Sequence, residues 1–407
     1  MIKQSTILAC LLATANLFAQ ALTPEVTSWI INPGGETGYN NIPSNVQQVQ
    51  YSAANVYVTT TCIPGYDIGP WAGNPNTPAN QNFVFKITRN PQKNTGNLIS
   101  TPLGHIGVWT NGVSVFNAKD AMSWQNQGIW NRNAIVAEGP SFDNCLGHPA
   151  PNGEYHHHLN PTCLYDDSDE GNHSPIVGYA FDGFPIYGCF GYANTDGTGG
   201  VKRMKSSYRK RNITVRQTKP DGTQLPANQY GPVVNGTYPL GLYLEDFEYV
   251  AGLGDLDEHN GRFCVTPEYP EGIYCYFITL DNNGVAEYPY ILGPQYYGTV
   301  QAGNTGPQSG HNVPNEPVQT YSPTSGIPDV PEQLKIEVFP NPSEGKFILI
   351  FPETETIECR VYDGLGRVIY QQIQVRNGEF FQLTTPGVYF LMAQSANERA
   401  VKRLVVR

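Results

Sequence analysis

The stretch HSPIVGYAFDGFPIYG, residues 173–188, determines how the centre of this chain folds. Two runs of β-branched and aromatic residues, Tyr179 to Phe181 and Phe184 to Tyr187, lie on either side of Asp182-Gly183. An Asp-Gly pair between two such runs favours a two-residue turn, because both turn positions need a backbone with positive φ. The stretch therefore predicts a β-hairpin.

The same pattern recurs along the chain. Asn111-Gly112 separates two further apolar runs in the same way. The 407 residues include 42 glycines, 33 prolines and 25 tyrosines, whereas only 14% are charged. This composition is typical of short strands joined by ordered loops. Residues 120–136 favour a helix, although Gly128 weakens that prediction. We therefore expect a mainly β fold: an antiparallel β-rich domain with long loops over residues 22–300.

The N-terminus predicts an export signal over residues 1–21. Lys3 precedes an apolar run over residues 7–18, and Ala19 and Ala21 supply the small residues of a cleavage site. The run is shorter than the roughly 18 residues that a spanning helix needs. No later segment approaches that length, so we expect no transmembrane segment.

Charge and cysteine content narrow the function further. The net charge is −11 and no basic cluster outweighs it, which argues against nucleic acid as a partner because phosphate binding needs a basic surface. Six cysteines lie between positions 62 and 275, an even number that is typical of disulfides in an oxidising compartment. Cys145 and Cys163 bracket a histidine-rich segment, and Cys264 and Cys275 flank a possible hairpin. The sequence leaves the connectivity open.

A change of composition divides the chain near its C-terminal end. Residues 301–332 are rich in Pro, Gly, Ser and Asn and predict a linker, the alternative being an ordered loop that caps the domain. Residues 333–407 then contain six or seven short apolar runs with turn signals between them. They predict a small Ig-like β-sandwich.

The tail carries four motifs in a fixed order: Val338 to Pro342, Val361 to Val368, Pro386 to Leu391 and Lys402 to Arg407. Together they resemble the type A sorting domain of type IX secretion. The resemblance implies that the type IX secretion machinery is a partner. It also implies that the protein enters the periplasm through its signal peptide, crosses the outer membrane and is secreted or displayed at the cell surface.

The histidine-rich segment predicts a metal site. Five of the eight histidines lie between His148 and His173. In an extended backbone His156 and His158 point to the same face, close enough to bind one ion. A His-x-His pair with a third histidine is a familiar donor set for zinc or copper. We predict His156, His158 and His173 as ligands; weaker candidates are His105, His148 and Asp257. The alternative is that these histidines bind loop carbonyls.

No motif identifies a catalytic residue. Asp182, at the tip of the predicted hairpin, and Glu258, in an acidic segment at residues 255–262, are weak candidates for a general base. An Asp-Gly pair is also an ordinary turn. Catalytic residues therefore stay unknown at this level.

Three stretches in order resemble the YHYH domain family over residues 80–295: residues 153–158, 173–188 and 257–277. One position departs from the naming motif Tyr-His-Tyr-His, because His157 stands where the second tyrosine is expected. Both motif histidines are kept as His156 and His158. The family consists of extracellular proteins without an established activity, so the resemblance implies an architecture and not a reaction.

Three functions fit these observations. The first is a secreted or cell-surface domain that binds zinc or copper. The chain has only four methionines, and this scarcity of sulfur ligands argues against copper(I). The second is a metal-dependent extracellular hydrolase or oxidase. The third is a non-catalytic adhesion or glycan-binding module, since 12% aromatic residues could stack on a surface glycan or extracellular polymer. A solvent-open ion favours an enzyme, whereas a closed ion beside a flat tyrosine face favours the binding module.

Overall fold

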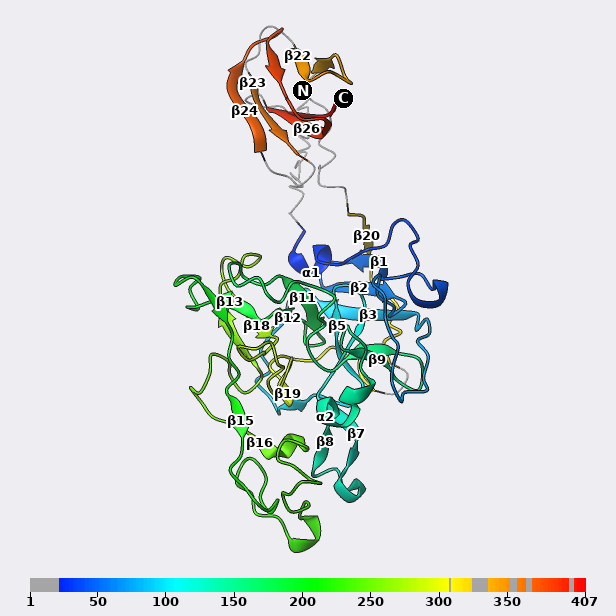
Figure 1. Ribbon diagram of the computed structural model, residues 1–407, viewed down its shortest axis with the longest axis vertical. Helices are drawn as coiled ribbons and strands as arrows, with labels where there is room; N and C mark the ends of the chain where they lie inside the picture. Colours follow the sequence, from blue (N-terminus) through cyan, green and yellow to red (C-terminus); the bar gives the residue numbers. More distant parts are fainter. Residues whose placement is uncertain (1–21, 307–308, 324–335, 352–356, 364–367, 395–398) are drawn as a thin grey trace, which may run out of the picture. The chain divides into compact units, whose positions relative to one another are not determined.

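The computed structural model describes residues 22–306, 309–323, 336–351, 357–363, 368–394 and 399–407. The expected export signal lies outside these residues. The chain forms two compact units that meet in sequence between Tyr321 and Ser322 (Figure 1). Strands dominate both units and the helices are short, so the predicted mainly β fold is confirmed. In the described part of the chain, no helix is long and apolar enough to cross a membrane.

An eight-stranded sheet forms the centre of the first unit, in the order β17-β18-β12-β11-β5-β6-β10-β9. The predicted hairpin at residues 173–188 supplies the neighbouring strands β11 and β12, which are antiparallel, and Gly183 turns the chain between them at φ +90°. The pairs β6–β10 and β12–β18 are parallel; the other neighbours are antiparallel. The strands are β5 (His105–Trp109), β6 (Ser114–Phe116), β9 (Gly147–Pro149), β10 (Tyr155–His157), β11 (Ile176–Ala180), β12 (Pro185–Tyr187), β17 (Gly261–Cys264) and β18 (Ile273–Phe277).

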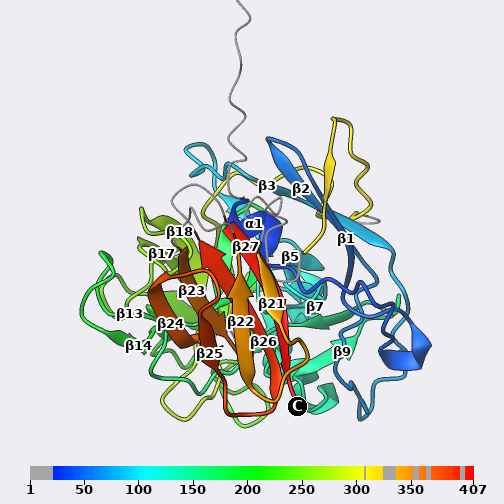
Figure 2. The ribbon, with the colours of Figure 1, turned by 90° about the horizontal axis from the view of Figure 1, so that it is seen from above.

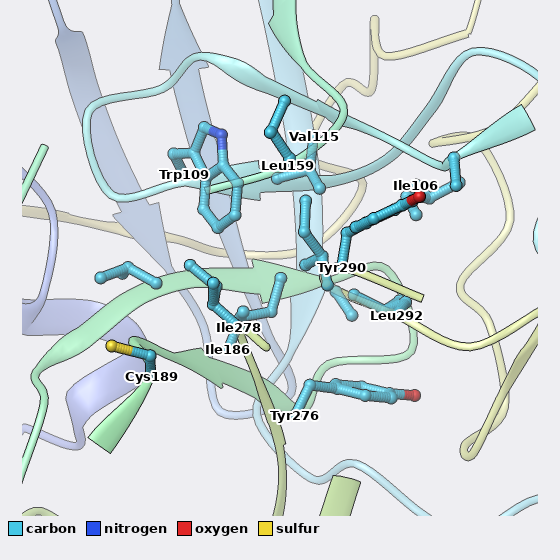
Figure 3. Packing of buried hydrophobic residues seen from close by; sticks show 14 of the residues in the cluster. Ile106, Trp109, Val115, Leu159, Ile186, Cys189, Tyr276, Ile278, Tyr290 and Leu292 are labelled. Carbon is cyan, nitrogen blue, oxygen red and sulfur yellow. The ribbon is translucent and has the colours of Figure 1, made fainter. Parts of the chain in front are cut away.

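Both faces of this sheet are buried. One face packs against a four-stranded sheet of order β20-β1-β2-β3, with Tyr179 and Phe277 in the shared core. The other face is covered by loops, and Ile106, Trp109 and Ile186 lie in that second core (Figure 3). Side chains alternate between the two cores because successive residues of a strand point to opposite faces. The covering strands are β1 (Val46–Tyr51), β2 (Asn55–Thr60), β3 (Phe83–Thr88) and β20 (Gln319–Tyr321).

Shorter elements complete the unit. Residues 120–136 do not form the expected helix: Gly128, at φ +68°, helps turn the chain so that β7 pairs with β8, and only α2 follows as a short helix. The strand pairs are β4 (Ile99–Ser100) with β19 (Gln295–Tyr296), β7 (Lys119–Ser123) with β8 (Asn131–Asn133), β13 (Phe190–Tyr192) with β14 (Val201–Arg203), and β15 (Tyr208–Lys210) with β16 (Phe247–Tyr249). The helices are α1 (Pro24–Thr27) and α2 (Ala134–Glu138), with 3-10 turns at Tyr39–Asn41, Trp124–Asn126, Gly139–Ser141, Ala227–Gln229 and Leu244–Asp246.

The first part of the expected linker packs against the first unit. β20 pairs with the edge strand β1. Asn304 bonds both backbone groups of Lys86, at 2.9 and 2.6 Å. Hydrogen bonds to the backbone need few apolar side chains. The composition of residues 301–321 therefore does not reveal this packing.

The second unit consists of two sheets, β21-β22-β25 and β24-β23-β26-β27, labelled in Figure 2. Phe347, Leu349, Val361 and Leu391 fill the core between them, which makes the unit a small β-sandwich. Its strands are β21 (Glu337–Phe339), β22 (Lys346–Ile350), β23 (Ile357–Tyr362), β24 (Val368–Val375), β25 (Phe380–Gln382), β26 (Gly387–Gln394) and β27 (Arg399–Val406).

One of the two suggested disulfides is formed. Cys145 is bonded to Cys163, and this bond brackets β9 and β10. The Sγ atoms of Cys264 and Cys275 lie 3.5 Å apart on neighbouring strands and are not bonded to each other.

The turn between β5 and β6 gives a stability prediction. Gly112 has φ +81°, and a Cβ there would overlap the side chain of Thr60. We expect Gly112→Ala to lower the free energy of unfolding by roughly 2–4 kcal/mol, from the positive φ and the overlap together. Urea unfolding followed by tryptophan fluorescence measures this, because all five tryptophans lie in the first unit.

Gly104→Ala is the matched control. Gly104 has φ +82° but no atom within 4 Å of the added Cβ, so only the backbone cost of about 1 kcal/mol applies. Equal losses in the two variants would contradict the role assigned to Thr60.

Candidate metal centre

Four side chains converge beside the end of the central sheet. Each of Glu138, His148, His156 and His158 places one donor atom within 4.8 Å of the other three. The three imidazoles are buried, and the Glu138 side chain is 29% exposed. The group combines three nitrogen donors with one carboxylate oxygen.

Strand register brings the histidines together. In the antiparallel pair β9–β10, His148 lies directly opposite His156. Opposed residues of such a pair point to the same face, and so do residues two apart in one strand. His148, His156 and His158 therefore share one face, and α2 adds Glu138 from its last residue.

The donor atoms form a closed ring. Nε2 of His156 lies 3.1 Å from Nε2 of His148 and 3.1 Å from Nε2 of His158. Oε2 of Glu138 lies 3.1 Å from the His148 nitrogen and 3.3 Å from the His158 nitrogen. All four contacts are too short to leave room for another side chain inside the ring.

Hydrogen bonds fix the tautomer of each imidazole. Nδ1 of His156 bonds the carbonyl oxygen of Glu154 at 3.0 Å, and Nδ1 of His158 bonds the carbonyl oxygen of Asn117 at 2.5 Å. A carbonyl oxygen only accepts, so both Nδ1 atoms carry the hydrogen. The neutral rings therefore present Nε2 lone pairs to the centre.

His148 follows the same logic through a hydroxyl. The Ser141 hydroxyl donates its single hydrogen to the carbonyl oxygen of Glu138, at 2.8 Å. With its hydrogen on that carbonyl oxygen, it accepts from Nδ1 of His148, which lies 2.8 Å away. Three Nε2 lone pairs and a carboxylate thus face one another. Their electrostatic repulsion would be removed by a cation bound between them.

The separations suit a four-coordinate ion. Donors about 2.05 Å from one ion lie roughly 3.3 Å apart in a tetrahedron and roughly 2.9 Å apart along the edge of a square. The four measured separations of 3.1 to 3.3 Å fall in this interval. The donor set therefore fits zinc and copper(II) alike.

The protonation states favour a divalent cation. Burial lowers the pKa of His156 well below its usual value, and the charges of His158 and His148 lower it further. Burial by itself would raise the pKa of Glu138, but the neighbouring imidazoles of His148 and His158 outweigh this and hold it well below its usual range. When all three imidazoles are neutral, the carboxylate gives the site one negative charge.

A cavity of about 580 Å³ opens onto the ring, and all four donor residues line it. Phe116 forms part of its wall and stacks on His156, with ring centroids 3.8 Å apart. Asn74, Asn76 and Lys119 add polar groups to the lining. A molecule in this cavity would meet the donor ring directly.

The remaining predicted ligands lie elsewhere. The His173 ring packs between Tyr187 and Tyr192, with centroid distances of 5.0 and 4.9 Å, and is not part of the ring of donors. Nδ1 of His105 binds a carboxylate oxygen of Glu154 at 2.9 Å. Asp257 accepts from the hydroxyl of Tyr274 and from backbone N–H groups of its own turn.

Neither candidate for a general base lines the cavity. Asp182 is fully buried and accepts from the Tyr276 hydroxyl at 2.6 Å and from the Gly298 N–H at 2.8 Å. Burial raises its pKa to about 6. Through these two hydrogen bonds Asp182 holds the sheet and the loop at Gly298 together. The Glu258 side chain is 55% exposed, and its Oε1 lies 3.9 Å from Nε2 of His259.

Sequence reasoning missed Glu138 and gave His148 too little weight. Glu138 lies in no motif and precedes His148 by ten residues, with a 3-10 turn between them. The one local signal for His148 is its place on an apolar stretch before the turn that leads to Tyr155. His157, the position that departs from the family motif, is fully buried on the opposite face, so the departure leaves the donors untouched.

The fold and the tail define a class: an exported β protein with a C-terminal sorting unit. The family model described as "Secretion system C-terminal sorting domain" matches residues 337–407, and the one described as "YHYH protein" matches residues 84–289. The chain belongs to the YHYH family. The sorting tail directs it to secretion or to the cell surface through the type IX machinery.

Other comparisons add little. No curated protein matches the chain. A solved structure from Porphyromonas gingivalis, of PorZ, "an essential bacterial surface component of the type-IX secretion system", aligns with 11% identity and a TM-score of 0.15. The alignment covers 92% of this chain and 60% of that one. A TM-score this low carries no argument about the fold or the function.

The hydrogen bonds predict the protonation of the ring. We expect His156 to stay neutral at pH 6, where a free histidine is more than half protonated, because burial and its neighbours lower its pKa. Its hydrogen should reside on Nδ1. Nitrogen-15 NMR of the metal-free full-length chain distinguishes the two tautomers; a hydrogen on Nε2 of His156 would contradict the assignment.

Proposed function

We propose that the first unit is a secreted or cell-surface metal-binding domain whose ion is held by Glu138, His148, His156 and His158. The observation that carries the proposal is the convergence of three Nε2 lone pairs and one carboxylate. Each Nδ1 hydrogen is bonded to an acceptor outside the ring of donors. Outward bonds of this kind orient the histidines of known metal sites.

Zinc or copper(II) is the proposed ion. Imidazole nitrogens suit these ions better than calcium or magnesium, which take oxygen donors. Copper(I) prefers sulfur, and the chain has four methionines in all. The donor separations support both ions, so metal content decides between them.

A metal-dependent hydrolase or oxidase is a second candidate, favoured by the cavity that opens on the donors. A bound zinc ion would supply an activated water, whereas copper(II) would supply redox chemistry. The chain would contribute the orientation of the donors and the partly apolar wall at Phe116. Phosphoester hydrolysis and phenol oxidation by the zinc- and copper-loaded chain, compared with the double variant described below, test this candidate.

Adhesion or glycan binding has less support. Stacking on sugars needs exposed aromatic faces, but many tyrosines of the first unit are buried in its cores, among them Tyr155, Tyr179, Tyr276 and Tyr296. These side chains stabilise the sheet instead of forming a flat exposed surface.

Metal content tests the proposal directly. The full-length chain, prepared without a histidine tag, is expected to carry close to one zinc or copper ion per molecule by plasma mass spectrometry. His156→Ala/His158→Ala should lower the affinity by at least about 100-fold, since even loss of an outer-shell partner costs 10- to 100-fold.

His173→Ala is the matched control, because this histidine lies outside the donor ring and should leave the metal content unchanged. A folded wild type that stays empty after zinc and copper are added would refute the proposal. So would loss of metal in His173→Ala with retention in the double variant.

The outer hydrogen bond to His148 gives a graded prediction. Ser141→Ala removes the acceptor that holds the Nδ1 hydrogen of His148, so the ring is free to rotate. We expect a roughly 10-fold weaker zinc affinity. Competition with a chromophoric chelator measures it, and the exposed Ser168→Ala is the control. An unchanged affinity in Ser141→Ala would show that His148 needs no such support.

A further inference from the structure

A second group of polar side chains lies outside the metal centre. The hydroxyl of Ser309 lies 2.9 Å from Nε2 of His105, and Nδ1 of the same ring lies 2.9 Å from Oε1 of Glu154. The three side chains thus form a hydroxyl–imidazole–carboxylate relay. They come from residues far apart in sequence, on β5, just before β10, and in the segment that follows β19.

The carboxylate end of this relay is firmly held. Glu154 is buried, and the hydroxyl of Ser114 donates to its Oε1 at 2.5 Å. The His105 ring packs edge-on against Phe83, Phe85 and Phe181, with centroid distances of 5.3, 5.3 and 5.7 Å. Few other orientations are open to this imidazole, so its two nitrogens keep their partners.

The tautomer follows from the partners. An ionised carboxylate only accepts, so the hydrogen of a neutral His105 resides on Nδ1 and leaves a lone pair on Nε2. That lone pair is directed at the Ser309 hydroxyl. The same hydroxyl also lies 2.7 Å from the carbonyl oxygen of Gly306 and 3.1 Å from that of Asn304. Its single hydrogen reaches any of the three acceptors by rotation about one bond.

A cavity of about 360 Å³ adjoins the relay. Ser309, His105 and Glu154 all line it, together with the apolar side chains of Phe83 and Leu103 and the amide of Asn152. A small molecule with an apolar end and a carbonyl group matches this lining. The amide of Asn152 is a candidate donor to a carbonyl oxygen that becomes negative.

We propose that Ser309, His105 and Glu154 form an acyl-transfer site that cleaves carboxylic esters with a short apolar acyl chain. Ser309 Oγ attacks the ester carbonyl carbon and its proton passes to His105 Nε2. The bond to the alcohol oxygen breaks, and His105 returns the proton to the leaving alcohol. Water then attacks the acyl-serine in the same way and releases the acid. Glu154 accepts from Nδ1 of His105 and orients the imidazole throughout.

The site is independent of the metal ring in its chemistry but shares one residue with it. The carboxylate of Glu154 serves His105, while its backbone carbonyl holds His156. Variants at Glu154 would disturb both sites, so the test uses Ser309 and His105. All reactions are carried out in excess EDTA, which removes any metal-dependent hydrolysis.

A serine-reactive fluorophosphonate provides the test on the full-length chain. The probe should bond to Ser309 with loss of fluoride, which peptide mass spectrometry locates. Ser309→Ala should lose this adduct, and His105→Ala should form it at least about 100-fold more slowly. Ser168→Ala, at an exposed serine without a histidine partner, should be labelled like the wild type.

Hydrolysis of p-nitrophenyl acetate gives an independent measurement that does not need the His105 variant to fold. The hydrolysis rate of Ser309→Ala is expected to equal the background rate without protein. The melting temperature of this variant is checked to be unchanged. The proposal is overturned if the wild type forms no adduct at Ser309, if other serines are labelled equally, or if Ser309→Ala hydrolyses the ester as fast as the wild type.

Discussion

The pairing of β10 with β9 on one side and β6 on the other is the constraint on which the candidate sites depend. It places His156 opposite both His148 and Ser114. Side chains alternate along a strand, so a slip of one residue would turn His156 and His158 into the core and bring His157 out. The Cys145–Cys163 bond closes a loop around these strands and stabilises them by about 3 kcal/mol in the chain-entropy model.

The buried central sheet is what allows polar groups to be held so firmly. A core of buried apolar residues packs against each of its faces. Donors for the ring therefore come from short segments at one edge, where β9, β10 and α2 end. Each outward Nδ1 hydrogen finds an acceptor in nearby backbone or in Ser141. A metal-free site of this kind keeps its shape because the acceptors belong to the fold and not to the ion.

Export explains the division of the chain. The sorting unit has its own core of apolar residues, so it folds around different contacts from those that build the first unit. The first unit in turn extends to Tyr321, because β20 completes its smaller sheet by pairing with β1. Ser309 lies in that added segment, which brings a hydroxyl to the His105 ring that no residue of the preceding sheet supplies.

Local patterns in the sequence determined the hairpin at residues 173–188, the sorting tail and the common face of His156 and His158, since each depends on neighbours a few positions apart. Tertiary structure alone decided that Glu138 and His148 join these histidines and that His173 does not. Strand pairing and the packing of α2 set those positions, and both depend on contacts between segments that have no regular spacing in the chain. The same holds for Ser309. Its segment has few apolar residues and is positioned by hydrogen bonds to the edge strand β3.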